Sequence, residues 1–327
     1  MSNERIEQLL TDANAAIDAG DIGRAVAGYQ EVLASEPDNY EACLMLGSLL
    51  GEAGQLEQAA ALLRSAAAVR TDDATASITL GHVLRAMGDG AGAIAALEEA
   101  VRREPRDYDA ICTLGSMFAE SEYRAEAVAQ FRQAAEIDPQ RAEAWSALGA
   151  MLILQDDAQA AVDTLKTARR IDPEDREIPL QLGMAYIQLE RLDEAESILQ
   201  EALSQHASYP DLQFWLAEAQ KRHGRLADAL LSNAAARSMA PDNDQYVIQA
   251  AAITEAQGDT DAAFALLQPV LQSDDVPVEA ALLFALMSRT LGRMNDARSL
   301  LDSVASKDIT PEQRGKIDEV MIWLETV

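Results

Sequence analysis

An alanine recurs at every 34th residue along most of this 327-residue chain. Nine alanines share the spacing, namely Ala25, Ala59, Ala93, Ala127, Ala161, Ala195, Ala229, Ala263 and Ala297. Such an interval indicates a repeat array, in which each unit is one supersecondary element. The register predicts nine units without insertion: 6–39, 40–73, 74–107, 108–141, 142–175, 176–209, 210–243, 244–277 and 278–311.

Each unit has the pattern of two amphipathic helices, as the fifth unit shows. Its apolar residues recur at steps of three and four in both halves, and the pattern breaks at 155–157. Gly149 and Ala161 are small where two helix axes are expected to approach closely. Pro173 ends the second helix, because proline has no N–H and disfavours helix in the residue before it. The sequence therefore predicts an all-α fold of antiparallel helix pairs.

The ends of the array and of its helices also carry signals. Six glycines stand where a first helix is expected to end, as a left-handed C-terminal cap requires: Gly20, Gly54, Gly88, Gly224, Gly258 and Gly292. Thr310 and Gln313 form a candidate capping box around Pro311. We expect residues 1–5 to lead into the array and residues 312–327 to form a helix that caps its last unit.

The fourth unit carries a specific combination of residues: Ile111, Leu114, Gly115, Phe118, Ala127, Phe131, Ala134 and Pro139. On these residues the chain resembles the tetratricopeptide repeat family. The resemblance implies a right-handed superhelical solenoid, whose first helices line a concave face that usually holds a peptide or partner segment. Units seven to nine depart from the pattern, since Ala217, Ala251 and Ala285 replace its glycine and Asn233 takes an apolar position. We expect these units to pack less tightly.

Composition excludes several classes of function. The chain has 55 Asp and Glu against 26 Lys and Arg, and its net charge of −29 repels a phosphate backbone. No nucleic-acid partner is therefore expected. No apolar run is long enough to insert into a membrane, and the N-terminal residues lack the pattern of a secretory signal. Because two cysteines cannot form a disulfide framework, we expect a cytoplasmic protein.

No catalytic constellation is evident in the sequence. The three histidines His82, His206 and His223 are scattered, and none has a second ligand at metal-binding spacing on its own helix. His82 could lie near Cys112 of the next repeat, but a chance proximity explains this pair better than a metal or thiol-base site. The glycines of residues 88–93 imitate a dinucleotide-binding loop, yet they follow a predicted helix rather than a strand. The sequence predicts no enzyme activity, no metal and no cofactor.

The positions that face inward, by resemblance to the family, supply the candidate binding residues. The apolar ones are Ile153, Leu154, Leu180, Met184, Ile187, Phe214 and Trp215, and the basic ones are Lys221 and Arg222. Acids fill the second position of seven units, including Glu143, Glu177 and Asp211, where they also suit the helix dipole. Apolar surface of this kind marks a partner site if it is exposed. The alternative is that these side chains lie in the seams between repeats.

We therefore predict a non-catalytic scaffold or adaptor that binds a partner protein or peptide of apolar and basic character. Two alternatives stay open. One is a self-assembling structural scaffold, for which Leu282 and Leu286 could supply homo-oligomeric contacts. The other is a protein that recruits substrates for a separate glycosyl- or sulfotransferase.

Overall fold

The computed structural model describes residues 1–326, and over this range it contains α-helices joined by short turns and no strand. The helices are α1 (Asn3–Asp18), α2 (Ile22–Ser35), α3 (Tyr40–Glu52), α4 (Leu56–Val69), α5 (Thr75–Ala86), α6 (Gly90–Arg103), α7 (Tyr108–Glu120), α8 (Arg124–Ile137), α9 (Ala142–Leu154), α10 (Ala158–Ile171), α11 (Glu177–Gln188), α12 (Leu192–Gln205), α13 (Pro210–Arg222), α14 (Leu226–Met239), α15 (Asp244–Ala256), α16 (Thr260–Leu271), α17 (Val278–Ser288), α18 (Met294–Ala305) and α19 (Pro311–Thr326). The all-α class predicted from the sequence is confirmed. None of these helices combines the length and apolar character needed to cross a membrane.

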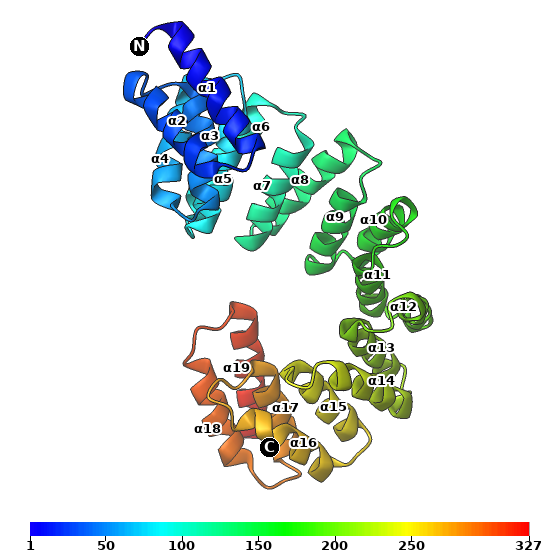
Figure 1. The fold of residues 1–327 in the computed structure, drawn as a ribbon. Coiled ribbons are helices and arrows are strands. Elements are labelled where there is room, and N and C mark those ends of the chain that lie inside the picture. Colours follow the sequence, from blue (N-terminus) through cyan, green and yellow to red (C-terminus); the bar gives the residue numbers. More distant parts are fainter. Residues whose placement is uncertain (327) are drawn as a thin grey trace. The chain divides into compact units, whose positions relative to one another are not determined.

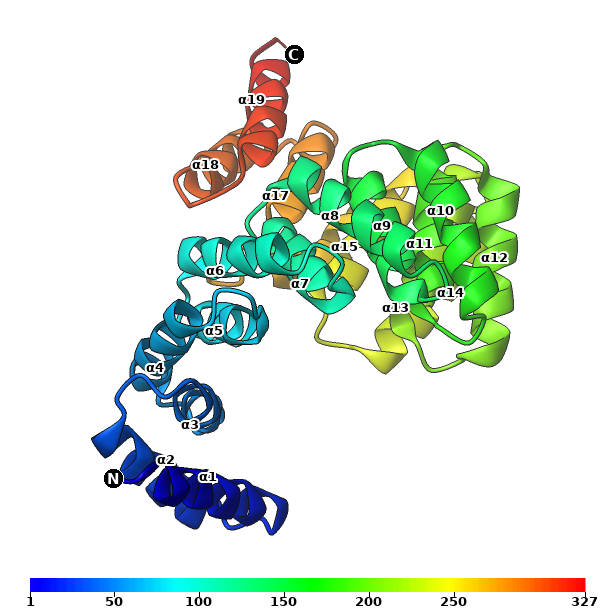
Figure 2. The same cartoon turned by 90° about the horizontal axis from the view of Figure 1, so that it is seen from above.

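The chain forms two compact units, a first unit Met1–Pro173 with α1–α10 and a second unit Glu174–Val327 with α11–α19. The nine 34-residue segments are called repeats from here on. Within each unit the helices pack against their neighbours in chain order, as Figure 1 and the turned view in Figure 2 show. From α1 to α18, odd-numbered helices are the first of each pair and even-numbered helices are the second. The first helices from α3 to α17 begin at intervals within one residue of 34, at Tyr40, Thr75, Tyr108, Ala142, Glu177, Pro210, Asp244 and Val278.

A small residue stands where the two helices of a pair pack against each other. A Cβ placed on Gly149 of α9 would stand 2.5 Å from Cγ and Cδ2 of Leu165 on α10. The same clash, at 2.7 Å, would arise between Gly183 and Leu199 in the second unit. Because real carbon atoms do not approach so closely, only glycine lets these helices pack at this distance. The repeated small residue therefore sets the spacing inside each pair.

The turn between the two helices of a pair requires a left-handed residue. All six glycines predicted for this role have positive φ, between 66° for Gly292 and 89° for Gly258. In three other pairs, Glu122, Asp156 and Glu190 hold the same conformation, with φ of 63°, 59° and 54°. A side chain makes this conformation costly, so these three turns carry local strain.

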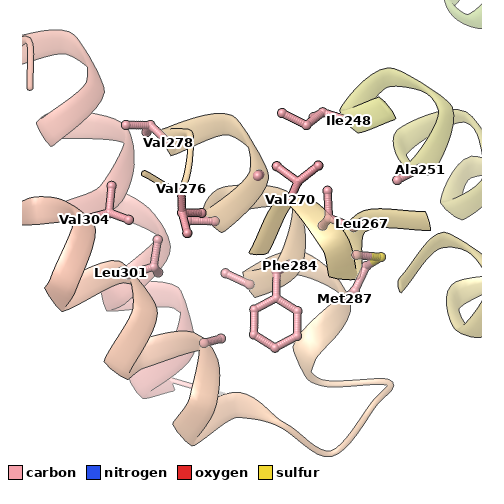
Figure 3. Close-up of a cluster of buried hydrophobic side chains, with 14 of the residues drawn as sticks. Ile248, Ala251, Leu267, Val270, Val276, Val278, Phe284, Met287, Leu301 and Val304 are labelled. Carbon is pink, nitrogen blue, oxygen red and sulfur yellow. The ribbon is translucent and has the colours of Figure 1, made fainter. Parts of the chain in front are cut away.

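The last helix covers the end of the second unit. Its predicted capping box is present: Gln313 N donates to Thr310 Oγ1 at 3.2 Å, and Thr310 N donates to Gln313 Oε1 at 3.1 Å. Ile317 and Leu324 of α19 are buried in one apolar cluster with side chains of α15–α18. Figure 3 shows part of this cluster, in which Leu267, Phe284 and Leu301 come from three successive helices. Residue 327, the end of the expected terminal helix, lies outside the described residues.

The polar residues that break the repeat pattern in the later pairs are buried with hydrogen-bond partners. Asn233, 1% exposed, donates through Nδ2 to Tyr246 O at 2.8 Å and to Gln249 Oε1 at 2.9 Å. Ser232 donates to Gln220 Oε1 at 2.8 Å. A buried polar group with partners avoids the free-energy cost of lost hydration, so these positions link α13, α14 and α15 through directional bonds.

Replacing Glu122 or Asp156 with glycine should stabilise the protein by about 0.5–1 kcal/mol. The left-handed conformation costs a residue with a side chain about 1–2 kcal/mol, and the larger entropy of an unfolded glycine offsets part of the gain. Chemical denaturation measures the change. Gly54→Ala is the reverse control and should lower stability. A loss of stability in Glu122→Gly or Asp156→Gly would contradict this explanation of the turns.

Candidate partner-binding surface

Three first helices of the second unit lie beside one another, since α11 contacts α13 and α13 contacts α15. Met184 on α11 and Phe214 and Trp215 on α13 are partly exposed. These three are the predicted apolar binding residues that this unit presents to solvent. We call them, together with Tyr246 of α15, the aromatic surface.

Phe214 joins the other two aromatic rings of this surface. Its ring lies edge-on to Trp215, with centroids 5.4 Å apart, and tilted against Tyr246 at 5.4 Å. Such offset contacts are favourable beyond the area that they bury. Phe214 is therefore held between a neighbour on its own helix and a ring from the next first helix.

Hydrogen bonds fix the backbone beneath the aromatic surface. Gln249 donates through Nε2 to Phe214 O at 3.0 Å, and its Oε1 accepts the bond from Asn233. The hydroxyl of Tyr246 donates to Asp211 Oδ1 at 2.6 Å. Burial and this bond raise the pKa of Tyr246, so the hydroxyl stays protonated and remains a donor. The backbone of Phe214 and the ring of Tyr246 are therefore held in place before any ligand binds.

Several acids at the second position of the repeats already have partners. Asp211 accepts from Tyr246, and Glu177 accepts from the hydroxyl of Tyr209 at 2.6 Å. In the first unit of the chain, Arg141 donates to Glu143 at 2.8 Å and to Asp109 at 2.9 Å. Each of these donors stands near the start of a first helix. Its acceptor, which is Asp211, Glu177 or Asp109, lies on the first helix of the preceding repeat. These acids therefore bridge successive repeats, in addition to suiting the helix dipole.

The two basic residues of α13 are neutralised within the chain. Glu218 pairs with Lys221 Nζ at 2.6 Å and with Arg222 Nε at 3.1 Å, and Arg222 also reaches Glu190 at 3.2 Å. Burial alone would raise the pKa of Glu218, but the two cations outweigh it and lower the pKa below its usual value. Lys221 and Arg222 therefore do not present a free positive patch beside Trp215.

Three predicted binding residues are buried and are not part of an exposed surface. Ile187 is 2% exposed, Ile153 5% and Leu180 9%. Ile153 and Ile187 take the twelfth position of their repeats, the position that Gly51 holds in the second repeat. A Cβ on Gly51 would stand 3.1 Å from Cγ2 of Val83 on the next first helix. Neighbouring repeats cover this position, so Ile153 and Ile187 lie in the seams between repeats. In the first unit, Leu154 is 50% exposed and Glu143 is exposed.

Family models agree with this architecture. Two models, both described as tetratricopeptide repeat, match the chain, one at residues 16–82, 50–115, 117–178 and 152–207 and the other at residues 180–244. Together they span well over half of the sequence. The chain belongs to the tetratricopeptide repeat family. The solenoid of helix pairs that the resemblance implied is therefore confirmed as its fold.

Solved structures show the same fold at low sequence identity. A tetratricopeptide repeat protein from Parabacteroides merdae is 17% identical, with a TM-score of 0.68 over 76% of this chain and 98% of that one. Yeast Tom70 is 14% identical, with a TM-score of 0.59 over 99% of this chain and 89% of that one. PilW, a type IV pilus biogenesis factor, is 20% identical, with a TM-score of 0.57 over 63% and 96%. No match was found among the curated proteins.

The sequence analysis of this repeat protein missed Tyr246 and Gln249. A signal was available for Tyr246, because the first helices of repeats two to seven and nine carry Ala, Ile or Leu at the same position, the third of the repeat. A tyrosine there must find a polar partner for its hydroxyl when it is buried. Gln249 gave no such signal, since its role depends on Asn233 of the preceding helix. Within residues 1–326, no group of three or more His, Cys, Asp or Glu is placed to hold a metal ion.

Glu218→Gln should lower stability by about 1 kcal/mol at pH 7, because its ion pairs with Lys221 and Arg222 are partly exposed and such pairs contribute up to about that much. A carboxylate with a lowered folded-state pKa stabilises the fold above its unfolded pKa of about 4.3 and loses this contribution as the pH falls through the folded value. The gap between the wild type and the variant should therefore close below about pH 4. Denaturation curves across pH measure it, and a gap that is independent of pH would contradict the assignment.

Proposed function

We propose that this protein is a non-catalytic scaffold that binds a segment of a partner protein on its first helices. The observation that carries the proposal is the aromatic surface, in which Phe214 and Trp215 are partly exposed while Tyr246 and Gln249 hold Phe214 in place. Aromatic residues are the side chains most enriched at binding hot spots. A preorganised surface also loses less conformational entropy when a ligand binds.

The partner segment would carry apolar and basic side chains. Its apolar groups would pack on Met184, Phe214 and Trp215, the exposed part of the surface. Its Lys or Arg would approach Asp211 and Glu177, whose carboxylates accept one tyrosine bond each and keep further lone pairs. The net charge of −29 would steer a basic partner toward the protein.

The buried residues contribute to shape rather than to contact in this proposal. Leu180 and Ile187 support the helices that carry the surface, and Ile153 does the same in the first unit. Leu154 and Glu143 are proposed as separate exposed contacts of the first unit. Lys221 and Arg222 are proposed to hold the end of α13 through Glu218, leaving the acids as the charged contacts.

One observation favours self-association as a second candidate function. Leu286 is 55% exposed on α17, where a polar residue would cost the fold nothing. Its neighbour Leu282 is only partly buried. Light scattering over a concentration series separates the two functions, because an adaptor of this kind stays monomeric while a self-assembling scaffold gains mass.

Phe214→Ala combined with Trp215→Ala should weaken partner binding by about tenfold or more, since hot-spot truncations cost about 2 kcal/mol. A partner recovered by affinity capture from native lysate would be titrated against the wild type and the variant by calorimetry. Leu231→Ala, which removes a side chain that is 72% exposed on α14, is the matched control and should change nothing. Undiminished affinity in a double variant with native helicity would refute the placement of the site.

A further inference from the structure

A groove runs between two successive second helices of the first unit, α6 and α8. It consists of two hollows of about 470 and 520 Å³ that share Glu98, Phe118 and Glu126 in their walls. Ile94, Glu98 and Val101 line it on α6, and Glu126 and Gln130 line it on α8. Residues three or four apart lie on one face of a helix, so each wall is a continuous helix face.

The groove is long enough for a short helix. Its α6 wall extends from Ala91 to Arg102 and its α8 wall from Tyr123 to Gln133. With a rise of 1.5 Å per residue, these walls are roughly 15 Å long, which equals about ten residues of a bound helix.

The floor of the groove is apolar and the rim is acidic. Phe118 of α7 forms the floor, and the ring of Tyr123, 54% exposed, meets it edge-on with centroids 6.2 Å apart. Glu98 and Glu126 are exposed on opposite walls. Within the described residues neither carboxylate forms a hydrogen bond or an ion pair. Arg102 also lines the groove, but it is paired with Glu99. The carboxylates of Glu98 and Glu126 therefore face the groove without a cation of their own.

A buried acceptor in the same groove lacks a partner. Oε1 of Gln130 is inaccessible to solvent and makes no hydrogen bond in the structure. Such a group costs free energy until a donor reaches it. Gln130 lines the α8 wall one turn beyond Glu126, but because its Oε1 is shielded from solvent a bound segment reaches this atom only after the side chain rotates.

From this geometry we propose that the α6–α8 groove is a second binding site, which takes a basic amphipathic helix of a partner protein. Apolar side chains of that helix pack on Phe118, Ile94 and Val101. Its Lys or Arg side chains pair with Glu98 and Glu126. Charge complementarity selects this occupant, because an acidic or purely apolar helix leaves both carboxylates unpaired. The walls of this site are second helices and its floor is Phe118 of α7, and it shares no residue with the aromatic surface.

The test uses a fluorescent helical peptide of about 12 residues made of Leu, Ala and Lys, with its leucines three and four positions apart. Anisotropy at about 0.15 M salt measures its affinity. Ala129→Trp fills the groove from an exposed wall position, and Ala95→Trp places the same ring on the exposed part of α6 outside it. We expect about tenfold weaker binding for Ala129→Trp and unchanged binding for Ala95→Trp.

Charge reversal separates the site from the general negative charge of the protein. Glu98→Lys combined with Glu126→Lys should weaken peptide binding by about tenfold or more, because two charge pairs with the peptide are lost. Glu57→Lys with Glu136→Lys changes the net charge equally at exposed positions of α4 and α8 outside the groove and should have little effect.

Three results would overturn the proposal: no measurable binding to the wild type, equal losses in both pairs of charge variants, or full affinity in Ala129→Trp. The double alanine variant at Phe214 and Trp215 should bind this peptide normally. If that variant alone loses the peptide, the aromatic surface is the site and the groove is not.

Discussion

The structure depends on the close contact between two helices of one repeat at a small residue. Where Gly149 meets Leu165, no atom larger than hydrogen fits on the glycine Cα without displacing the leucine. The same arrangement recurs at Gly183 and Leu199. Each pair is thereby held to one geometry, so that the next first helix docks at a set distance and rows of first helices and second helices form side by side. Both proposed binding surfaces are products of this arrangement.

Contacts between repeats add a second layer of specificity. Tyr246 to Asp211, Tyr209 to Glu177 and Arg141 to Asp109 are bonds from one first helix to the one before it. An acid in the first turn therefore serves two purposes, since it interacts with the helix dipole and it locks the adjoining repeat. The aromatic surface uses this layer, because the hydrogen bond from Tyr246 to Asp211 helps to fix the ring that packs against Phe214. The α6–α8 groove differs in that its acids, Glu98 and Glu126, are not used in this way.

The sequence predicted the helix pairs, the left-handed glycine turns and the terminal capping box because each depends on local spacing. It predicted the candidate surface only in part. Ile187 and Trp215 look alike as apolar residues at inward positions, and only the packing of the neighbouring repeat distinguishes the buried one from the exposed one. The pairing of Lys221 and Arg222 with Glu218 follows helix spacing and could have been foreseen. The hydrogen bond of Gln249 to Phe214 could not, since it joins two repeats through backbone geometry.

The most direct test of the helix contact is the stability of Gly149→Ala. Alanine favours a helix over glycine by about 1 kcal/mol, so propensity alone predicts stabilisation. The contact predicts the opposite, a loss of about 1–3 kcal/mol, because the added Cβ overpacks against Leu165. Gly315→Ala in α19, where a Cβ would meet nothing within 4 Å, is the control and should stabilise the protein. Equal stabilisation by both substitutions in denaturant titrations would contradict the role assigned to the small residue.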